Sequence, residues 1–429
     1  MNLYDDQHTL SIATHNRKED TVFSVVSRVR FGEYALDKPH RPAYIESGLR
    51  ISHRGRAVSG APHQPEHHMQ MLSRLLVRAY CENGPETSPE DLEQLKRDLR
   101  YVSELGREQL ADFLELANTN HVVVRALTIL QNAAAALDYR HLADWCEICL
   151  ANEKARIAHG IEMLQSVCAA LEARGCKITV IKSLDHWPDL GSDLDLYTTA
   201  DERRVEQVMR EEFDARPVQR SWGDRLAHKW NYRVPGLPEL IEVHVQYLGQ
   251  TGEHAQMAKR VVERRVRKVV GGREFHVPAP EERIVISTLQ RVYRHFYFRL
   301  CDMIDMTLLM QTEALDFNEL RKAAEVAGIW PGVATFLHLI QSYIKSYGGD
   351  VPLPQEVIAA AYSRGDRVRF GNGFLRVSKF TGAGLYGSQL MHAGRRRDLR
   401  ALLRLPLLPP LAVSALVAHG LTGNDKGIW

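Results

Sequence analysis

The chain has 429 residues, of which 45% are hydrophobic and 25% are charged. These are the fractions of an ordinary globular protein, and the length is sufficient for two or three domains with a substantial core. The formal net charge of +2 argues against an extended nucleic-acid-binding surface, although local basic patches are compatible with it.

Cysteine content and the first residues bear on the compartment. Six cysteines in a chain of this size do not form a disulfide framework, and the opening MNLYDDQHTL does not resemble a signal peptide. We therefore expect a cytoplasmic protein with reduced thiols. No stretch resembles a full transmembrane helix.

Residues 1–64 are polar and irregular, with one hairpin-like patch at Tyr44–Ile51. This composition predicts a loosely ordered arm or a small β element. His63, His67 and His68 raise the question of a metal site, but their spacing fits no standard one.

Residues 65–175 have the apolar three-to-four spacing of a helical region. The sequence Thr87-Ser88-Pro89-Glu90 is typical of a helix start. Further helices are predicted at Arg107–Asn118, Asn120–Leu137, Tyr139–Ala151 and Asn152–Arg174. Gly175 is expected to end the last of them.

A Cys-x-x-Cys pair, Cys146 and Cys149, lies inside this helical region. Zinc binding and redox chemistry are the functional interpretations. The chain has no second such pair, and this spacing on an apolar helix also suits two packed thiols, which we favour.

The stretch Ile178–Thr198, ITVIKSLDHWPDLGSDLDLYT, contains the chemical signal of the sequence. It begins with a β-branched run typical of a buried strand and ends in an Asp-x-Asp pattern. Side chains alternate along a strand, so Asp193 and Asp195 project from the same face. Neighbouring carboxylates repel each other unless a cation binds between them. The alternative is a solvated edge strand.

This stretch resembles the signature of the DNA polymerase beta-like nucleotidyltransferase superfamily, an apolar strand ending in Gly-Gly or Gly-Ser and followed by Asp-x-Asp/Glu. It is most similar to a bacterial nucleotidyltransferase branch whose first strand ends in Lys-Gly. Lys182 fits that branch and Ser183 fits the wider pattern, but the glycine that lets the backbone approach phosphate is missing. The resemblance covers roughly residues 152–305.

The superfamily pattern requires a third carboxylate on a later strand, and Leu240–Gln246 contains a candidate. Glu242 and His244 share one face of this predicted strand, and the related branch has an acid-x-His arrangement there. Glu242 is therefore the expected third acid. Glu239 and Asp185 are the replacements if Glu242 points elsewhere.

The resemblance implies transfer of a nucleotidyl group from a nucleoside triphosphate, ATP or another, to an acceptor, with release of pyrophosphate. Two Mg²⁺ ions about 3.5–4 Å apart would be bound by Asp193, Asp195 and Glu242. A second group of residues would hold the triphosphate: Lys182, Ser183 and Ser192. The acceptor stays open among a sugar, an antibiotic, a peptide, a protein and a nucleic acid.

Residues 176–278 form the predicted core. A helix is expected at Asp201–Phe213, and strands are expected at Arg216–Trp222, Leu226–Val234 and Leu240–Gln246. Arg267–Val277 predicts a hairpin with Gly271-Gly272 as its turn. The basic run Lys259–Lys268 is either a solvated helix face, which we favour, or an anion-attracting wall beside the active site.

Residues 279–394 predict a second helical region. Helices are expected at Ile284–Leu300, Cys301–Met310, Asn318–Ala327, Val333–Tyr347 and Gln355–Arg364. Arg294 and His295 are candidates for phosphate contact, with core or surface pairing as the alternative. The glycines between residues 371 and 387 predict a loose, turn-rich segment.

Residues 395–429 form a basic and apolar tail. Leu405–Ala418 carries no charge but contains three prolines, so it does not span a bilayer. An apolar segment beside Arg395–Arg397 can lie peripherally at a membrane interface, or it can pack on the protein itself, which we favour.

These patterns together predict an α+β protein: a small mixed-sheet nucleotidyltransferase core flanked by N-terminal and C-terminal helical regions. The expected activity is metal-dependent nucleotidyl transfer. Two alternatives remain: a catalytically inactive nucleotidyltransferase-like binding module, motivated by the missing glycine, and a membrane-peripheral interaction protein.

Overall fold

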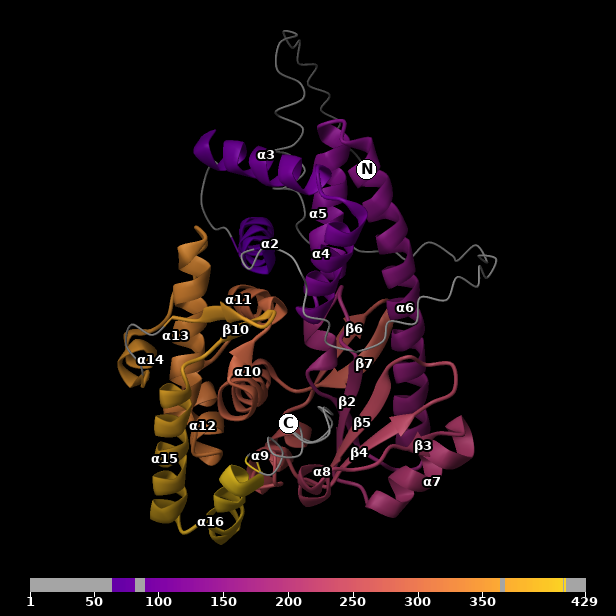
Figure 1. Ribbon diagram of the computed structural model, residues 1–429. Helices are drawn as coiled ribbons and strands as arrows, with labels where there is room; N and C mark the ends of the chain where they lie inside the picture. The colour runs from indigo at the N-terminus through magenta and orange to yellow at the C-terminus, as the bar shows by residue number, and fades with distance from the viewer. Residues whose placement is uncertain (1–63, 82–88, 363–366, 412, 414–429) are drawn as a thin grey trace, which may run out of the picture.

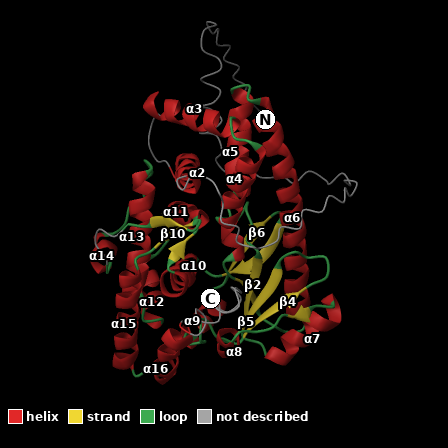
Figure 2. Cartoon of the chain, viewed as in Figure 1, coloured by secondary structure: helices red, strands yellow, loops and turns green. Residues whose placement is uncertain are grey.

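The structure, a computed structural model, describes residues 64–81, 89–362, 367–411 and 413. The predicted N-terminal arm therefore lies outside the described residues except for Gln64, and so do its patch Tyr44–Ile51 and His63. The described chain is α+β, with the strands gathered in the middle and helical regions on either side (Figure 2). This confirms the predicted fold class.

The N-terminal helical region precedes the sheet and lies at the top of Figure 1. It consists of α2 (Gln64–Cys81), α3 (Pro89–Ser103), α4 (Arg107–Thr119), α5 (Val123–Ala136) and α6 (Arg140–Ala173). Helix α3 contains Pro89 and Glu90 of the predicted helix start, whereas Thr87 and Ser88 lie outside the described residues. His67 and His68 lie in α2, where His68 packs against Tyr101 and Phe113. Neither histidine belongs to a group of potential metal ligands among the described residues.

Helix α6 is one helix of 34 residues, so the predicted break between Ala151 and Asn152 is wrong. Neither residue interrupts the hydrogen-bond ladder as a proline would. The helix ends at Ala173 and is closed by Gly175, whose φ of 78° allows its amide and that of Cys176 to donate to carbonyls of the last turn. Cys146 is buried in this helix, and burial raises the pKa of its thiol to about 12, which suits a packed rather than a reactive cysteine.

The central sheet has five strands in the order β1-β2-β5-β4-β3. The strands are β1 (Ile178–Val180), β2 (Asp193–Thr198), β5 (Leu240–Val245), β4 (Lys229–Arg233) and β3 (Arg216–Pro217). Strands β2 and β5 are parallel, whereas every other pair is antiparallel. The register of the parallel pair places Asp195 directly opposite Glu242.

Helices α6 and α7 (Glu202–Phe213) run beside the sheet on the right of Figure 1, and the C-terminal helices lie on the left. The predicted helix at Asp201–Phe213 is confirmed, with the Asp201 side chain accepting a hydrogen bond from the amide of Arg203 as its cap. The predicted strand Arg216–Trp222 is shorter than expected. Its last residue instead begins α8 (Trp222–Leu226), because the Ser221 hydroxyl caps that helix by accepting from the amide of Asp224.

The predicted hairpin forms β6 (Val266–Val270) and β7 (Arg273–Val277), with Gly271 and Gly272 both at positive φ in the turn. The basic run before it is divided between the end of α9 (Ala255–Glu263) and β6. Two of its arginines, Arg260 and Arg264, bind Glu282. Those two side chains are therefore paired with a carboxylate and do not form an anion-attracting wall.

The C-terminal helical region begins with α10 (Pro280–Thr288), but the helical stretch expected at Ile284–Leu300 does not continue to its end. The chain passes instead into the π-helical segment η2 (Leu289–His295), turns at Phe296 with a φ of 56° and forms β8 (Tyr297–Phe298). The remaining helices are α11 (Leu300–Thr312), α12 (Phe317–Val326), α13 (Trp330–Ser346), α14 (Gln355–Ala360), α15 (Lys379–Arg396) and α16 (Leu399–Arg404).

The glycine-rich segment is ordered, contrary to prediction. It contains β9 (Arg369–Gly371), β10 (Phe374–Arg376) and the first half of α15. Gly382 and Gly384 lie inside α15, where a Cβ would come within 2.2 Å of the rings of Phe296 and Tyr362. Close packing against aromatic rings therefore explains two of the glycines that suggested turns.

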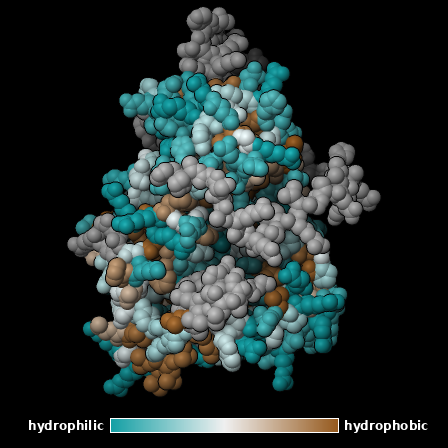
Figure 3. Space-filling model, in the orientation of Figure 1, coloured by the Kyte–Doolittle hydropathy of each residue, from teal (hydrophilic) through white to brown (hydrophobic). Residues whose placement is uncertain are grey.

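In the described part of the tail, some apolar side chains are buried against the protein and others are exposed. Leu405, in the short 3₁₀ segment η3 (Leu405–Leu407), is 1% exposed and packs with Ala393 and Ala401. Leu399 and Leu403, in α16, are 72% and 75% exposed. Figure 3 shows an apolar patch at the lower left, where α16 lies in Figure 1. Most of Leu408–Ala418 lies outside the described residues. Across the helices that the structure describes, none is long and apolar enough to cross a membrane.

Candidate functional site

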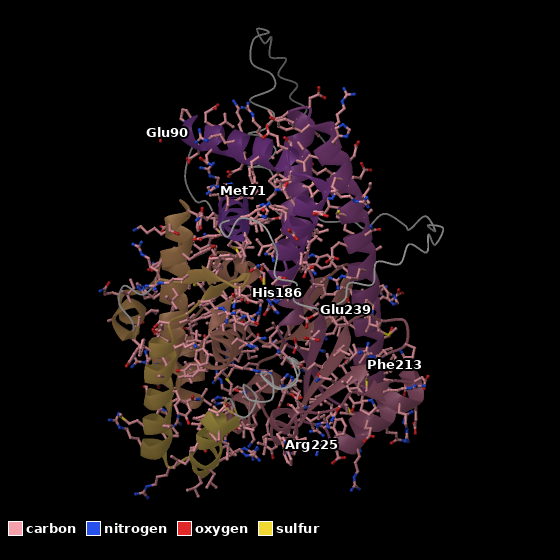
Figure 4. All side chains as sticks on the ribbon, viewed as in Figure 1. Met71, Glu90, His186, Phe213, Arg225 and Glu239 are labelled. Carbon is pink, nitrogen blue, oxygen red and sulfur yellow. The ribbon has the colours of Figure 1, made fainter. Side chains whose placement is uncertain are left out.

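A cavity of about 160 Å³ lies between the strands β2 and β5 and the π-helical segment η2. The lining combines the predicted site residues with several cations and histidines: His121, Lys182, Ser183, His186, Gly191, Ser192, Asp193, Asp195, Lys229, Glu242, Gln290, Arg291, Arg294, His295, Tyr297 and Arg299. In Figure 4 one of these residues, His186, lies near the centre of the molecule, below the N-terminal helices. All six residues that the sequence nominated for the site are therefore at one cavity.

Asp195 and Glu242 form the centre of the site. Both are buried, because they lie opposite each other on inner strands of the sheet. The Nζ of Lys229 donates to Oε2 of Glu242 at 2.9 Å, and Nε2 of His244 lies 2.8 Å from Oε1. Burial by itself would raise the pKa of Glu242, but Lys229 and Lys182 outweigh it and hold this pKa well below its usual range.

A compact group of potential metal ligands consists of Asp195, Glu242 and His244, whose ligand atoms lie within 4.8 Å of one another. Asp193 is outside this group, although it faces the same cavity. Its burial, together with the charges of Glu242 and Asp195, raises its pKa from 3.8 to about 6. The assignment of Asp193, Asp195 and Glu242 as metal ligands stays a prediction that this geometry accommodates.

Lys182 occupies a strained turn directly after β1. Its φ and ψ of 64° and −57°, with a 2.7 Å hydrogen bond from the amide of Ser183 to the carbonyl of Ile181, are those of a γ-turn. The turn directs Nζ of Lys182 to within 2.5 Å of Oδ1 of Asp195. Strain of this kind in a non-glycine residue is characteristic of functional sites.

Ser183, at the position where the resembled branch has glycine, connects the turn to β2 by hydrogen bonds. Its hydroxyl accepts a hydrogen bond from the amide of Asp195 at 2.8 Å and lies 3.1 Å from the carbonyl of Asp193. This hydroxyl is engaged with protein, whereas Ser192 is an exposed residue on the cavity wall.

Glu239 and Asp185, the expected alternatives to Glu242, both form ion pairs with arginines. Glu239 is paired with Arg156, and Oδ1 of Asp185 lies 2.7 Å from Nε of Arg283. Figure 4 shows Glu239 to the right of the centre, toward α6. Neither acid is needed as a substitute, since Glu242 is at the cavity.

Cations of the C-terminal region form the wall that faces the acids. Arg291 is buried and its Nε lies 2.7 Å from Oδ2 of Asp302. Arg294 and Arg299 have no carboxylate partner among the residues that the structure describes, and the Nε of each is buried without a hydrogen bond. Unpaired guanidinium groups at a cavity wall are suited to phosphate oxygens.

Sequence reasoning missed Lys229, Arg291 and Arg299 as parts of the site. A lysine within the strand-like run Leu226–Val234 is a usable signal, because it faces the same side as an acid once β4 pairs with β5. The two arginines give no comparable signal, since their position depends on how η2 and α11 pack against the sheet.

Comparison with known proteins adds little. No protein-family model and no curated protein matches the sequence. Among solved structures, an antigenic nucleotidyltransferase-like protein from Paracoccidioides brasiliensis matches with a TM-score of 0.27 and 14% identity. The match covers 45% of this chain and 93% of that protein. A similarity this weak supports no inference, so function is derived from the residues of the cavity.

Proposed function

We propose that this protein transfers a nucleotidyl group from a nucleoside triphosphate to a hydroxyl of an acceptor, with Mg²⁺ bound by Asp193, Asp195 and Glu242. One observation carries the proposal. Carboxylates on two parallel strands face, across one cavity, arginines that have no carboxylate partner among the described residues. This arrangement provides for a metal ion and a polyphosphate together.

The donor set fits magnesium. Carboxylate oxygens are the hard ligands that this ion prefers, and three of them line the sheet side of the cavity. Bound magnesium would supply charge neutralisation at the phosphates during the transfer. Lys182 and Lys229 compensate the same acids, as their contacts with Asp195 and Glu242 show.

The cationic residues bind and orient the triphosphate. Arg294 and Arg299 would hold phosphate oxygens from the helical side, and Lys182 with Ser192 would hold them from the sheet side. Binding from both sides fixes the α-phosphorus relative to the acceptor, which is the main contribution that positioning makes to such reactions.

The transfer itself exchanges one phosphorus–oxygen bond for another. The acceptor oxygen forms a bond to the α-phosphorus, the bond to pyrophosphate breaks, and the acceptor proton passes to a base. In this proposal Glu242 receives that proton, and His244, whose Nε2 lies 2.8 Å from its Oε1, holds the carboxylate in position. ATP is the first triphosphate to test, and the acceptor is to be identified by labelling.

The direct experiment compares wild type with Asp193→Asn, which removes one charge at nearly constant volume. Wild type should gain melting temperature with magnesium and triphosphate, since a ligand that binds only the native state stabilises it. Asp193→Asn should lose most of this gain and all transfer of α-labelled triphosphate to acceptors in cell extract. Asp144→Asn, an exposed position on α6, is the matched control and should behave as wild type.

Two results separate the rivals. A magnesium-dependent thermal shift without label transfer in any extract would favour the inactive binding module. If none of the four common triphosphates shifts the melting temperature of wild type, the proposed function is wrong.

A further inference from the structure

A second group of potential metal ligands lies beside the same cavity, with two of its members, His121 and His186, on the cavity wall. His121, His186 and Cys301 place one ligand atom each within 4.8 Å of the other two. They come from three separate segments: the residues after α4, the 3₁₀ segment η1 (Ser183–His186) and the start of α11. The proposed nucleotidyl transfer uses none of the three.

His186 is oriented as metal-ligating histidines are. Its Nδ1 lies 2.6 Å from Oδ2 of Asp305, which leaves Nε2 as the ring nitrogen available to a metal ion. Asp305 is fixed in turn by Arg125, whose Nη1 lies 2.6 Å from Oδ1. A carboxylate that holds the far nitrogen of a histidine fixes the ring for coordination and raises its basicity.

His121 supplies an independent indication. Its Nδ1 is buried without a hydrogen-bond partner among the described residues, which is costly for a ring nitrogen. The ring is clamped against Gly191, where an added Cβ would lie 2.8 Å from Cε1. A bound cation accounts for a histidine that is held in place and otherwise unsatisfied.

We propose that His121, His186 and Cys301 bind a zinc-class divalent cation, with the fourth coordination position open to the cavity. Two imidazole nitrogens and a thiolate are donors that zinc prefers, whereas magnesium prefers the carboxylates on the sheet side. In a tetrahedral site, zinc–nitrogen distances of about 2.0–2.1 Å and a zinc–sulfur distance of about 2.3 Å put neighbouring ligand atoms about 3.3–3.6 Å apart. The three ligand atoms, all within 4.8 Å of one another, would move closer together when the ion binds.

Binding has a defined proton balance and a structural consequence. The Cys301 thiol loses its proton to solvent as the sulfur–metal bond forms, so affinity should rise with pH. The ion would connect η1, which directly follows Lys182, to α4 and α11. The cation therefore secures the cavity wall independently of any triphosphate.

Cobalt(II) is the probe, because a thiolate–cobalt bond gives charge-transfer absorption in the near ultraviolet and tetrahedral cobalt absorbs in the visible. Full-length protein stripped with chelator should bind one equivalent with both signals, and zinc should displace it. Cys301→Ser should lose the charge-transfer band. His121→Gln should weaken binding by more than the roughly 10–100-fold that a supporting residue costs.

Two controls make the result specific. Cys176→Ser removes a buried thiol outside the group and should retain the band. Asp195→Asn alters the acidic group and should also retain it, which separates this site from the proposed magnesium site. The proposal is overturned if wild type shows no charge-transfer band, or if Cys301→Ser with native circular dichroism retains it.

Discussion

The ammonium nitrogen of Lys182 lies 2.5 Å from a carboxylate oxygen of Asp195, at the point where a predicted metal ligand meets a predicted phosphate ligand. The contact is possible because the γ-turn at Lys182 reverses the side chain over β2. One lysine can therefore compensate the acids in the free protein and turn to the phosphates when magnesium takes its place. Through this exchange Lys182 would link metal binding at the acids to triphosphate binding at the cations.

We expect Lys182→Met to weaken triphosphate binding. The substitution keeps most of the side-chain volume but removes the charge, so the thermal shift produced by magnesium and triphosphate should fall. Magnesium alone should bind at least as tightly as to wild type, because Asp195 loses its competing cation. Titration calorimetry with magnesium and with magnesium–ATP checks both expectations. Lys177→Met, exposed just before β1, is the control, and equal triphosphate affinity in both variants contradicts the role of Lys182.

The pKa of Asp193, raised to about 6, predicts a pH-dependent effect of its substitution. A carboxyl group whose pKa is higher in the folded state favours folding while it is protonated. That advantage is complete below about pH 4 and is lost as pH rises through 6. A rise from 3.8 to about 6 corresponds to about 3 kcal/mol.

Asp193→Asn should therefore unfold at higher urea than wild type at pH 7.5, and this difference should shrink toward zero at pH 4. The comparison with wild type at each pH cancels the contribution of other groups that titrate near 6, such as Asp189. A difference that does not depend on pH would show that burial and the charges of Glu242 and Asp195 do not raise the pKa of Asp193.

The acidic half of the site was predictable because strands alternate. Asp193 and Asp195 share a face by period, and the same period places Glu242 and His244 together. The resemblance required only a third acid on a later strand, and the structure shows that β2 and β5 are adjacent and parallel, with Asp195 opposite Glu242.

The cationic half was largely hidden, for physical reasons. Arg294 lies inside the π-helical segment η2, and Arg299 follows the chain reversal at Phe296, whereas their sequence has ordinary helical periodicity. Gly382 was misinterpreted because glycine usually interrupts a helix, but here close contact with the Phe296 ring requires it. Each of these features depends on tertiary contacts, which the local sequence pattern does not reveal.

A buried charge network should dominate the stability of the cavity wall. Arg125 is fully buried, with Nε 2.8 Å from Asp189 and Nη1 2.6 Å from Asp305. Arg125→Met leaves two buried carboxylates without their cation, so unfolding in urea should show a loss of about 3–5 kcal/mol. Arg140→Met, which breaks an exposed ion pair, should cost at most about 1 kcal/mol. Similar losses in the two variants would contradict this account.

The exposed face of α16 tests the expectation of peripheral membrane contact. Leu399 and Leu403 project on one side of the helix, which follows the arginine cluster at the end of α15. An apolar helix face beside basic residues binds anionic bilayers through burial and charge attraction.

Wild type should co-sediment with vesicles containing phosphatidylserine, less so at high salt, and Leu399→Ser/Leu403→Ser should reduce this binding several-fold. Ile148→Ser, at an exposed leucine-sized side chain on α6, should leave it unchanged. If wild type stays in the supernatant at low salt, the patch does not bind membranes, and packing of Leu405 beneath it is the only role that the structure supports for the described tail.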